Sequence, residues 1–95
     1  MSGKKFLHFD ISFKRIIPKD ITGHQLIKAL RKLGYESIRQ SGSYIRIQTL
    51  QNGKHSETIP NHKPMREGTV KSILKNIAKH FDITIENLEE LLFNK

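Results

Sequence analysis

The residues best suited to chemistry lie around a short turn in the middle of the chain. The stretch RQSGSYIRIQ places Tyr44 directly after a Gly-Ser turn, with Arg39 and Arg46 on either side of it. A phenol between guanidinium groups can stack on a nucleic-acid base, pack along a ribose or donate a hydrogen bond to a phosphate. The alternative is an ordinary strand tyrosine that covers sheet surface.

The five histidines are the other candidates for acid–base chemistry, because an imidazole titrates near neutral pH. We expect His62, in the loop PNHKP, to lie beside Tyr44; a loop histidine that contacts only backbone is the alternative. His55 is expected to be exposed near a hairpin tip, and His24 and His80 to be structural or solvent-facing. No pair has the spacing of a metal site, so we predict no metal and no cofactor.

Length and composition narrow the class of protein. The chain has 95 residues and no cysteine, which fits one small domain without disulfides or thiolate metal sites. No run reaches the ~18 apolar residues of a membrane span. His8 and Asp10 interrupt the first apolar residues too early for a signal peptide. We therefore expect a soluble, cytoplasmic protein.

Positive charge dominates most of the chain. There are 17 Lys and Arg against 9 Asp and Glu, a formal net charge of +8. Residues 1–81 hold 16 Lys and Arg and 5 Asp and Glu, whereas residues 82–95 hold one Lys and four acidic residues. A strongly basic body favours a polyanionic partner, most simply nucleic acid. A solvated charged surface is the alternative.

Local patterns predict the elements that position these residues. Period-two alternation over Leu7–Phe13 predicts a strand, either an added edge strand or an arm that pairs with another chain. Thr22 and Gln25 have capping-box spacing and predict the start of a first helix, which Gly34 ends. Its apolar stripe consists of Leu26, Ile27, Leu30 and Leu33.

Three strands are predicted after this helix: YESIRQ and YIRIQTL around the Gly-Ser turn, and then HSETIP. In YIRIQTL the isoleucines share one face, and Tyr44 and Arg46 share the other. A two-residue Asn-Gly turn would place Ile59 opposite Arg46, on the polar face. We prefer one additional residue in the connection, since this places Ile59 opposite Ile47 and Tyr44 across from His62.

Two more helices are predicted after the loop NHKPMREG. Thr69 is expected to cap the first of them, and Thr84 a short terminal helix with its glutamates outward. The apolar residues expected inward are Val70, Ile73, Leu74, Ile77, Ala78 and Phe81, and then Ile85, Leu88, Leu91 and Leu92. The predicted fold class is α+β, in the order α-β-β-β-α, with an N-terminal strand or arm and a short C-terminal helix.

The segment ITGHQLIKALRKLGYESIRQSGSYIRI, the loop IPNHKPMREGTVKSILKNIA and the order of elements resemble the HicA-type (YcfA-like) toxin family. Four features carry the likeness together: Gly-aromatic after the first helix, Arg-Gln before Gly-Ser, Pro-x-His after the third strand, and Gly-Thr opening the next helix. The resemblance implies a fold like the double-stranded-RNA-binding domain. It implies one domain over residues 18–95, with a terminal helix at 84–93 and residues 1–17 as an extension.

The resemblance also implies a metal-independent endoribonuclease, an mRNA interferase, with a HicB-like antitoxin as partner. The family's catalytic histidine directly follows its Gly-Ser, whereas here Tyr44 does. Such cleavage uses the neighbouring 2′-hydroxyl as nucleophile and needs a base, an acid and cations. A phenol, with an unperturbed pKa of ~10, is a poor base at neutral pH. We therefore expect weak or absent cleavage unless another group substitutes. His62 is the obvious substitute, so Tyr44 and His62 are the catalytic candidates.

We expect RNA contacts around the turn and the loop, with a lysine stripe as a second patch. The residues are Arg39, Ser43, Arg46, Lys63 and Arg66, and then Lys71, Lys75 and Lys79. Three interpretations stay open: an mRNA-cleaving toxin attenuated by Tyr44, an RNA-binding module that does not cut, and a domain that binds only an antitoxin. A homo-oligomer formed through Leu7–Phe13 is a further expectation, and no membrane partner is expected.

Overall fold

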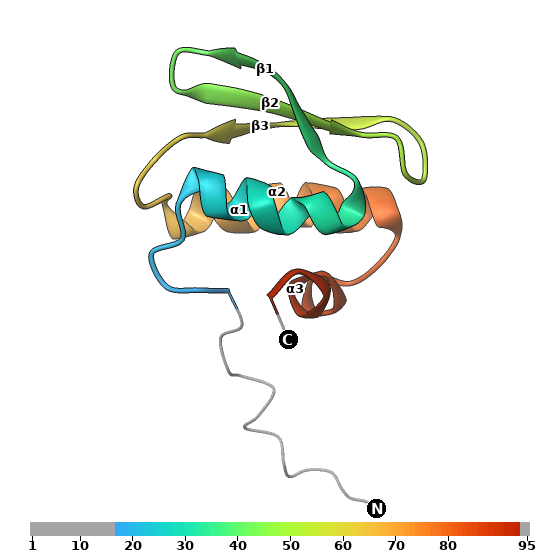
Figure 1. Ribbon diagram of the computed structural model, residues 1–95. Coiled ribbons are helices and arrows are strands. Elements are labelled where there is room, and N and C mark those ends of the chain that lie inside the picture. The colour runs from blue at the N-terminus through green and yellow to red at the C-terminus, as the bar shows by residue number, and fades with distance from the viewer. Residues whose placement is uncertain (1–16, 94–95) are drawn as a thin grey trace, which may run out of the picture.

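The computed structural model describes residues 17–93, in which a three-stranded sheet lies over helices (Figure 1). The elements are α1 (Gly23–Leu30), η2 (Arg31–Leu33), β1 (Glu36–Ser41), β2 (Tyr44–Thr49), β3 (His55–Pro60), α2 (Glu67–Phe81) and α3 (Ile85–Phe93). The predicted α+β class and the order α-β-β-β-α with a terminal helix are confirmed. The strand predicted over Leu7–Phe13, and the oligomer through it, lie outside the described residues.

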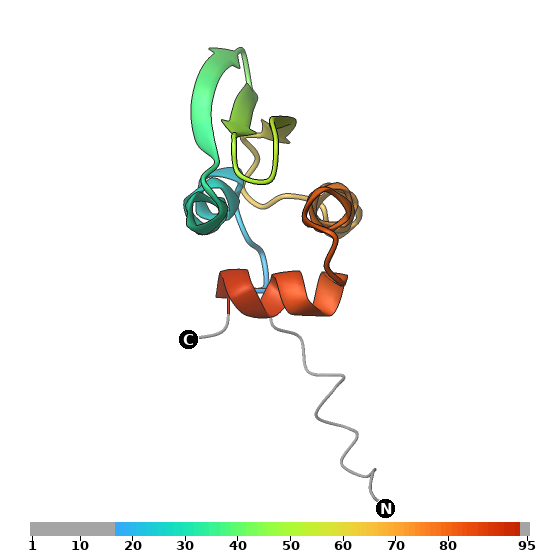
Figure 2. The ribbon, with the colours of Figure 1, turned by 90° about the vertical axis from the view of Figure 1, so that its right-hand side faces the viewer.

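The molecule has three layers. The antiparallel sheet, in the order β1-β2-β3, lies on α1 and α2, which run side by side, and α3 crosses beneath both (Figure 2). The core between the layers is built from Ile17, Ile21, Leu26, Ile27, Leu30, Tyr35, Ile45, Ile47, Ile59, Met65, Val70, Ile73, Leu74, Ile77, Ala78, Leu88 and Leu92. Within residues 17–93 no helix or strand covers the other face of the sheet. None of the described helices is long and apolar enough to span a bilayer.

The residues predicted to begin and end the first helical segment, and to cap the terminal helix, are confirmed. The Thr22 hydroxyl accepts a hydrogen bond from the Gln25 N–H at 3.1 Å, and the Gln25 side chain accepts one from the Thr22 N–H at 2.9 Å. Gly34 follows η2 in the left-handed conformation, with φ 83°. Thr84 caps α3 through the Asn87 N–H at 3.0 Å. Because these contacts are local, the sequence alone could predict them.

A lysine joins the first helical segment to the last one. Lys32 Nζ donates to the carbonyl oxygens of Leu92 at 2.9 Å and Leu91 at 3.4 Å, at the C-terminal end of α3. A cation at this position satisfies free carbonyl groups and complements the helix dipole. The contact fastens α3 beneath the helix layer.

Two predicted details of the later helices are wrong. The helix α2 begins at Glu67, two residues before Thr69, with Arg66 as an extended N-cap residue and no side-chain cap. Its first turn closes through the Val70 N–H and the Arg66 carbonyl at 3.0 Å, so the Thr69 hydroxyl is not needed as a cap. In α3, Leu91 is 53% exposed rather than inward.

The predicted register of the second hairpin is also wrong. Ile59 pairs with Ile45, not Ile47, and Tyr44 faces Pro60 instead of His62. The shift is two residues, so the apolar face remains consistent, as the alternation of side chains requires. The connection is a five-residue loop over residues 50–54, between the ends of β2 and β3.

Contacts with α2 explain this loop. The His80 Nε2 lies 3.0 Å from each of the carbonyl oxygens of Gln51 and Gly53, and the Asn52 side chain donates to the His80 carbonyl at 2.9 Å. An imidazole nitrogen between two carbonyls must carry the proton and donate. The end of α2 therefore holds the loop, and this tertiary contact overrides the two-residue Asn-Gly turn.

The prediction that His55 is an exposed hairpin residue is wrong. Its side chain is only 22% exposed, and its Nδ1 lies 2.7 Å from the hydroxyl of the buried Tyr35. Its Nε2 lies 3.3 Å from Glu57 Oε2, and its ring stacks on His80 with centroids 4.6 Å apart. A neutral imidazole fits these partners, with Nδ1 accepting from the phenol and Nε2 donating to the carboxylate.

The surroundings of His55 and Glu57 favour the uncharged form of each side chain. Burial lowers the pKa of His55, and the neighbouring His80 and Arg46 lower it further. Burial raises the pKa of Glu57, although a hydrogen bond from Asn76 and the charge of Arg46 oppose that change. The contact between His55 and Glu57 is therefore a hydrogen bond from a neutral ring at neutral pH, not a fully charged ion pair.

The lowered pKa of His55 predicts that acid weakens the fold. Above the unfolded-state pKa of 6.5, the imidazole is neutral in both the folded and the unfolded state, so it does not change the free energy of unfolding. As the pH falls below that value, the unfolded chain takes up a proton first, so the free energy of unfolding decreases until the folded-state pKa is passed. Urea unfolding between about pH 7.5 and 5.5 measures this decrease.

A His55→Gln variant should lose that part of the pH dependence, because glutamine keeps polar atoms but does not titrate. A His24→Gln variant, which changes an exposed histidine, should keep it. An equal pH dependence in the wild type and in His55→Gln would contradict the assignment.

Candidate functional site

In strand β2, the side chains of Tyr44 and Arg46 lie on the uncovered face of the sheet. Ile45 and Ile47 are buried against the helices, at 3% and 0% exposure. Because successive side chains alternate, Tyr44 and Arg46 must point away from the core. Tyr44 is 54% exposed, which is high for an aromatic side chain on a strand. The predicted assignment of faces in β2 is therefore confirmed.

Two arginines meet directly across this face. Arg39 of β1 pairs with Arg46 of β2, since a bulge at Ile38 shifts the register of β1. Arg46 Nη1 also donates to Thr58 Oγ1 of β3 at 2.9 Å, which fixes its guanidinium group. Like charges directly opposite each other in a sheet are destabilising. An anion placed between them would remove that cost.

The arginine pair lines a shallow depression with Tyr44. The side chains around it are Arg39, Ser41, Tyr44, Arg46 and Thr58, from all three strands. The depression thus combines guanidinium groups, a phenol and hydroxyls, all of which can donate hydrogen bonds to a phosphate. Sequence reasoning identified three of these residues. It missed Thr58 because the predicted register of the second hairpin was wrong. It also missed Ser41, although the two-residue turn Gly42-Ser43 places Ser41 opposite Tyr44.

His62 lies at the same end of the molecule as Tyr44. The β1–β2 turn, the end of β3 and the start of α1 gather there, on the left of Figure 1. The Asn61 N–H donates to the Ser43 carbonyl at 2.6 Å, and the His62 carbonyl accepts from the Gly23 N–H at 3.1 Å. The side chain of His62 is exposed. The backbone of its loop is therefore bonded to the residue that precedes Tyr44.

Asn61, between Pro60 and His62, was not identified from the sequence. Its side-chain Oδ1 is buried and accepts no hydrogen bond from residues 17–93. Its backbone N–H makes the bond to Ser43 described above. No sequence pattern indicates that Asn61 binds the backbone of Ser43, because this bond depends on a contact between two loops.

The remaining basic candidates fall into two groups. Lys63 and Arg66 are exposed in the loop that contains His62 and at the start of α2. The α2 lysine stripe, which we define as Lys71, Lys75 and Lys79, is exposed along α2. Because α2 lies under the sheet, the stripe belongs to a different surface from the arginine pair (Figure 1).

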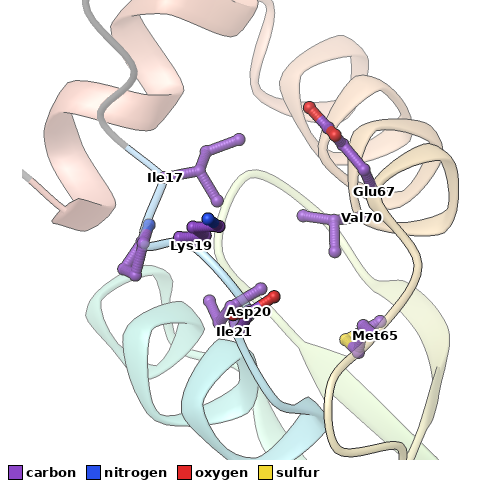
Figure 3. Close-up of a pocket in the computed structure, with 8 residues that line it drawn as sticks. Ile17, Lys19, Asp20, Ile21, Met65, Glu67 and Val70 are labelled. Atoms are coloured by element: carbon purple, nitrogen blue, oxygen red, sulfur yellow. The ribbon is translucent and has the colours of Figure 1, made fainter.

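A separate hollow of about 260 Å³ lies between residues 17–21 and the start of α2 (Figure 3). Ile17, Ile21, Met65 and Val70 supply its apolar lining, and Pro18, Lys19, Asp20 and Glu67 complete it. It contains none of the residues that the sequence predicted for chemistry. We therefore place the candidate site on the sheet and at its end, not in this hollow.

The chemistry available at the sheet is that of anion binding and proton transfer. The arginine pair can hold a phosphate, and the exposed ring of Tyr44 can stack on a base. His62 adds an imidazole, which is the side chain that most often acts as a general acid or base in proteins. Among residues 17–93 no group of three His, Asp or Glu side chains is arranged to hold a metal ion.

A comparison with protein-family models identifies a match. A family model described as the HicA toxin of bacterial toxin–antitoxin systems matches residues 23–78. The matched range begins at α1 and ends within α2, so it includes every residue of the depression and the loop with His62. Comparisons with curated proteins and with solved structures gave no significant match.

The arginine pair predicts that a bound anion stabilises the fold. Inorganic phosphate, compared with chloride at constant ionic strength, should raise the Tm of the wild type because it relieves the repulsion between Arg39 and Arg46. Arg39→Gln should remove most of this increase and should itself change the free energy of unfolding by less than about 1 kcal/mol.

Lys54→Gln is the matched control, since it removes one exposed positive charge from the hairpin loop, away from the pair. It should keep the response of the wild type. If phosphate stabilises all three proteins equally, the pair is not the anion site.

Proposed function

The chain belongs to the HicA toxin family of bacterial toxin–antitoxin systems, and from this we propose that it is a toxin that binds and cleaves RNA. The observation that carries the proposal is the cross-strand pair of Arg39 and Arg46 beside the exposed Tyr44. These side chains suit the phosphate, the ribose and the bases of an RNA strand. Lys63, Arg66 and the α2 lysine stripe are proposed to add phosphate contacts.

The proposed reaction uses the side chains of His62, Tyr44, Arg39 and Arg46. His62 acts as the base and takes the proton of the 2′-hydroxyl, whose oxygen then attacks the adjacent phosphorus. The bond from phosphorus to the 5′-oxygen breaks, and the phenol of Tyr44 gives its proton to that oxygen. Arg39 and Arg46 stabilise the charge on the phosphorane. The products are a 2′,3′-cyclic phosphate and a 5′-hydroxyl.

A second candidate function is RNA binding without cleavage. The observation that favours it is the residue after Gly42-Ser43, which is Tyr44 where the resembled family has its catalytic histidine. A phenol stacks on bases as well as an imidazole does but is a weaker base at neutral pH. For both candidates we propose a HicB-like antitoxin that covers the exposed sheet face, since that would shield Tyr44 and the arginines from RNA.

Cleavage in the presence of EDTA distinguishes these functions. The wild type, in excess over a mixed single- and double-stranded RNA, should yield fragments with 2′,3′-cyclic phosphate ends. His62→Ala should lower the rate by ~10²-fold or more, as loss of a general base does. His24→Ala, which removes another exposed imidazole, is the control and should keep the wild-type rate.

Tyr44→His should raise the cleavage rate, by up to ~10²–10⁴-fold, because it supplies a group that can act as both acid and base. RNA that stays intact with the wild type and is cut by Tyr44→His would establish the binding function. RNA that stays intact with both would contradict the catalytic proposal.

Salt dependence tests the RNA contacts. The logarithm of the binding constant should fall linearly with the logarithm of the salt concentration. Arg39→Gln and Arg46→Gln should each reduce the slope by about 1, since each removes one phosphate contact. Neutralising the α2 lysine stripe should reduce it further, and Lys54→Gln should not change it. An unchanged slope in the arginine variants would show that RNA does not use this face.

A further inference from the structure

The start of α1 packs closely against the loop after β3 at Gly23. Its N–H donates to the His62 carbonyl at 3.1 Å. A side chain at this position would overlap the Pro60 carbonyl oxygen and would bring its Cβ to 3.1 Å from the Asn61 Cα. These neighbours are backbone atoms, which cannot rotate away as the end of a flexible side chain can. Only a glycine therefore allows the observed contact.

The backbone conformation at Gly23 does not itself require glycine. Among residues 17–93 the glycines with positive φ are Gly34, Gly42 and Gly53, whereas Gly23 is the first residue of a regular helix. In a helix, alanine is favoured over glycine by up to ~1 kcal/mol. The reason for glycine at this position is therefore the contact with the loop and not the needs of α1.

The loop is held on both sides of His62. Toward the sheet, the Asn61 N–H donates to the Ser43 carbonyl at 2.6 Å, directly before Tyr44. Toward the helices, the Met65 N–H donates to the Ile21 carbonyl at 2.9 Å, beside the hollow shown in Figure 3. Residues 60–62 thus lie between the start of α1 and the turn that carries Tyr44. A displacement at α1 would move His62 relative to Tyr44.

We propose that Gly23 is a positioning residue for the catalytic pair: its missing side chain lets α1 hold residues 60–62 so that His62 and Tyr44 can act on the same phosphodiester. The inference rests on the proposed function, because it takes His62 as the base. Gly23 itself contacts no substrate and acts through the backbone of the loop. A shift of about 1 Å in a reacting group can cost ~10²-fold in rate.

The test compares Gly23→Ala with Gly68→Ala. Gly68 also lies in the first turn of a helix, but a Cβ there meets no atom within 4 Å. Gly23→Ala should lower the single-turnover cleavage rate by ~10–100-fold and leave the RNA dissociation constant unchanged, because the arginine pair lies on the sheet. Gly68→Ala should keep both values. A wild-type rate in Gly23→Ala would overturn the inference.

A double-mutant cycle separates positioning from general damage. If Gly23 acts through His62, Gly23→Ala should cost no further rate once His62→Ala is present. Equal costs in both backgrounds would overturn the inference while leaving the proposed function intact. If Gly23→Ala fails to fold, an ester oxygen in place of the Gly23 N–H removes the hydrogen bond without adding a side chain. That variant should also be slow, and a wild-type rate would overturn the inference.

The arrangement can also be tested if the wild type cleaves no RNA, an outcome that counts against the proposed function. Hydrogen exchange of the Asn61 N–H reports on its bond to Ser43. Gly23→Ala should speed this exchange, and Gly68→Ala should not. Equal exchange in the wild type and in both variants would show that α1 does not hold the loop.

Discussion

The burial of two isoleucines in the middle strand determines where the candidate site lies. Ile45 and Ile47 must face the helices, so Tyr44 and Arg46 must face outward. Successive cross-strand pairs lie on alternate faces of the sheet. The position of each buried pair therefore also determines which residues pair next to it on the uncovered face. The pairing of Ile45 with Ile59 places Arg46 beside Thr58, and the bulge in β1 places Arg39 opposite Arg46. A hydrophobic requirement on one face thus assembles a polar arrangement on the other.

Features that depend on near neighbours in the chain could be predicted from the sequence. The capping of α1 by Thr22 and Gln25, the end of the first helical segment at Gly34, and the faces of β2 all follow from local hydrogen bonds or from the period of the strand. Features that depend on distant contacts could not. The register of the second hairpin is set by His80, 27 to 29 residues further along the chain, which bonds its loop. Leu91 has the period of a buried residue, but α3 buries only Leu88 and Leu92 completely.

The candidate site shows the same division. The sequence identified Tyr44, Arg39 and Arg46, because they surround one short turn. The partners Ser41 and Thr58 come from the neighbouring strands and need the correct register. The role inferred for Gly23 needs the approach of two segments that are 37 residues or more apart in sequence, and no local pattern indicates it. The sequence therefore predicted which side chains lie together at the candidate site better than it predicted what holds them in place.

The contact of Lys32 with the end of α3 also has a consequence for encounters with other molecules. It fastens a helix with acidic side chains, among them Glu86 and Glu90, beneath the layers, while the arginine pair lies on top. Among residues 17–93, these acidic side chains therefore lie at the bottom of the fold and the arginine pair lies at its top. In the field of a polyanion such a molecule experiences a torque that turns its sheet toward the polyanion before contact. That orientation would raise the fraction of productive collisions at low ionic strength without adding a single contact to the complex.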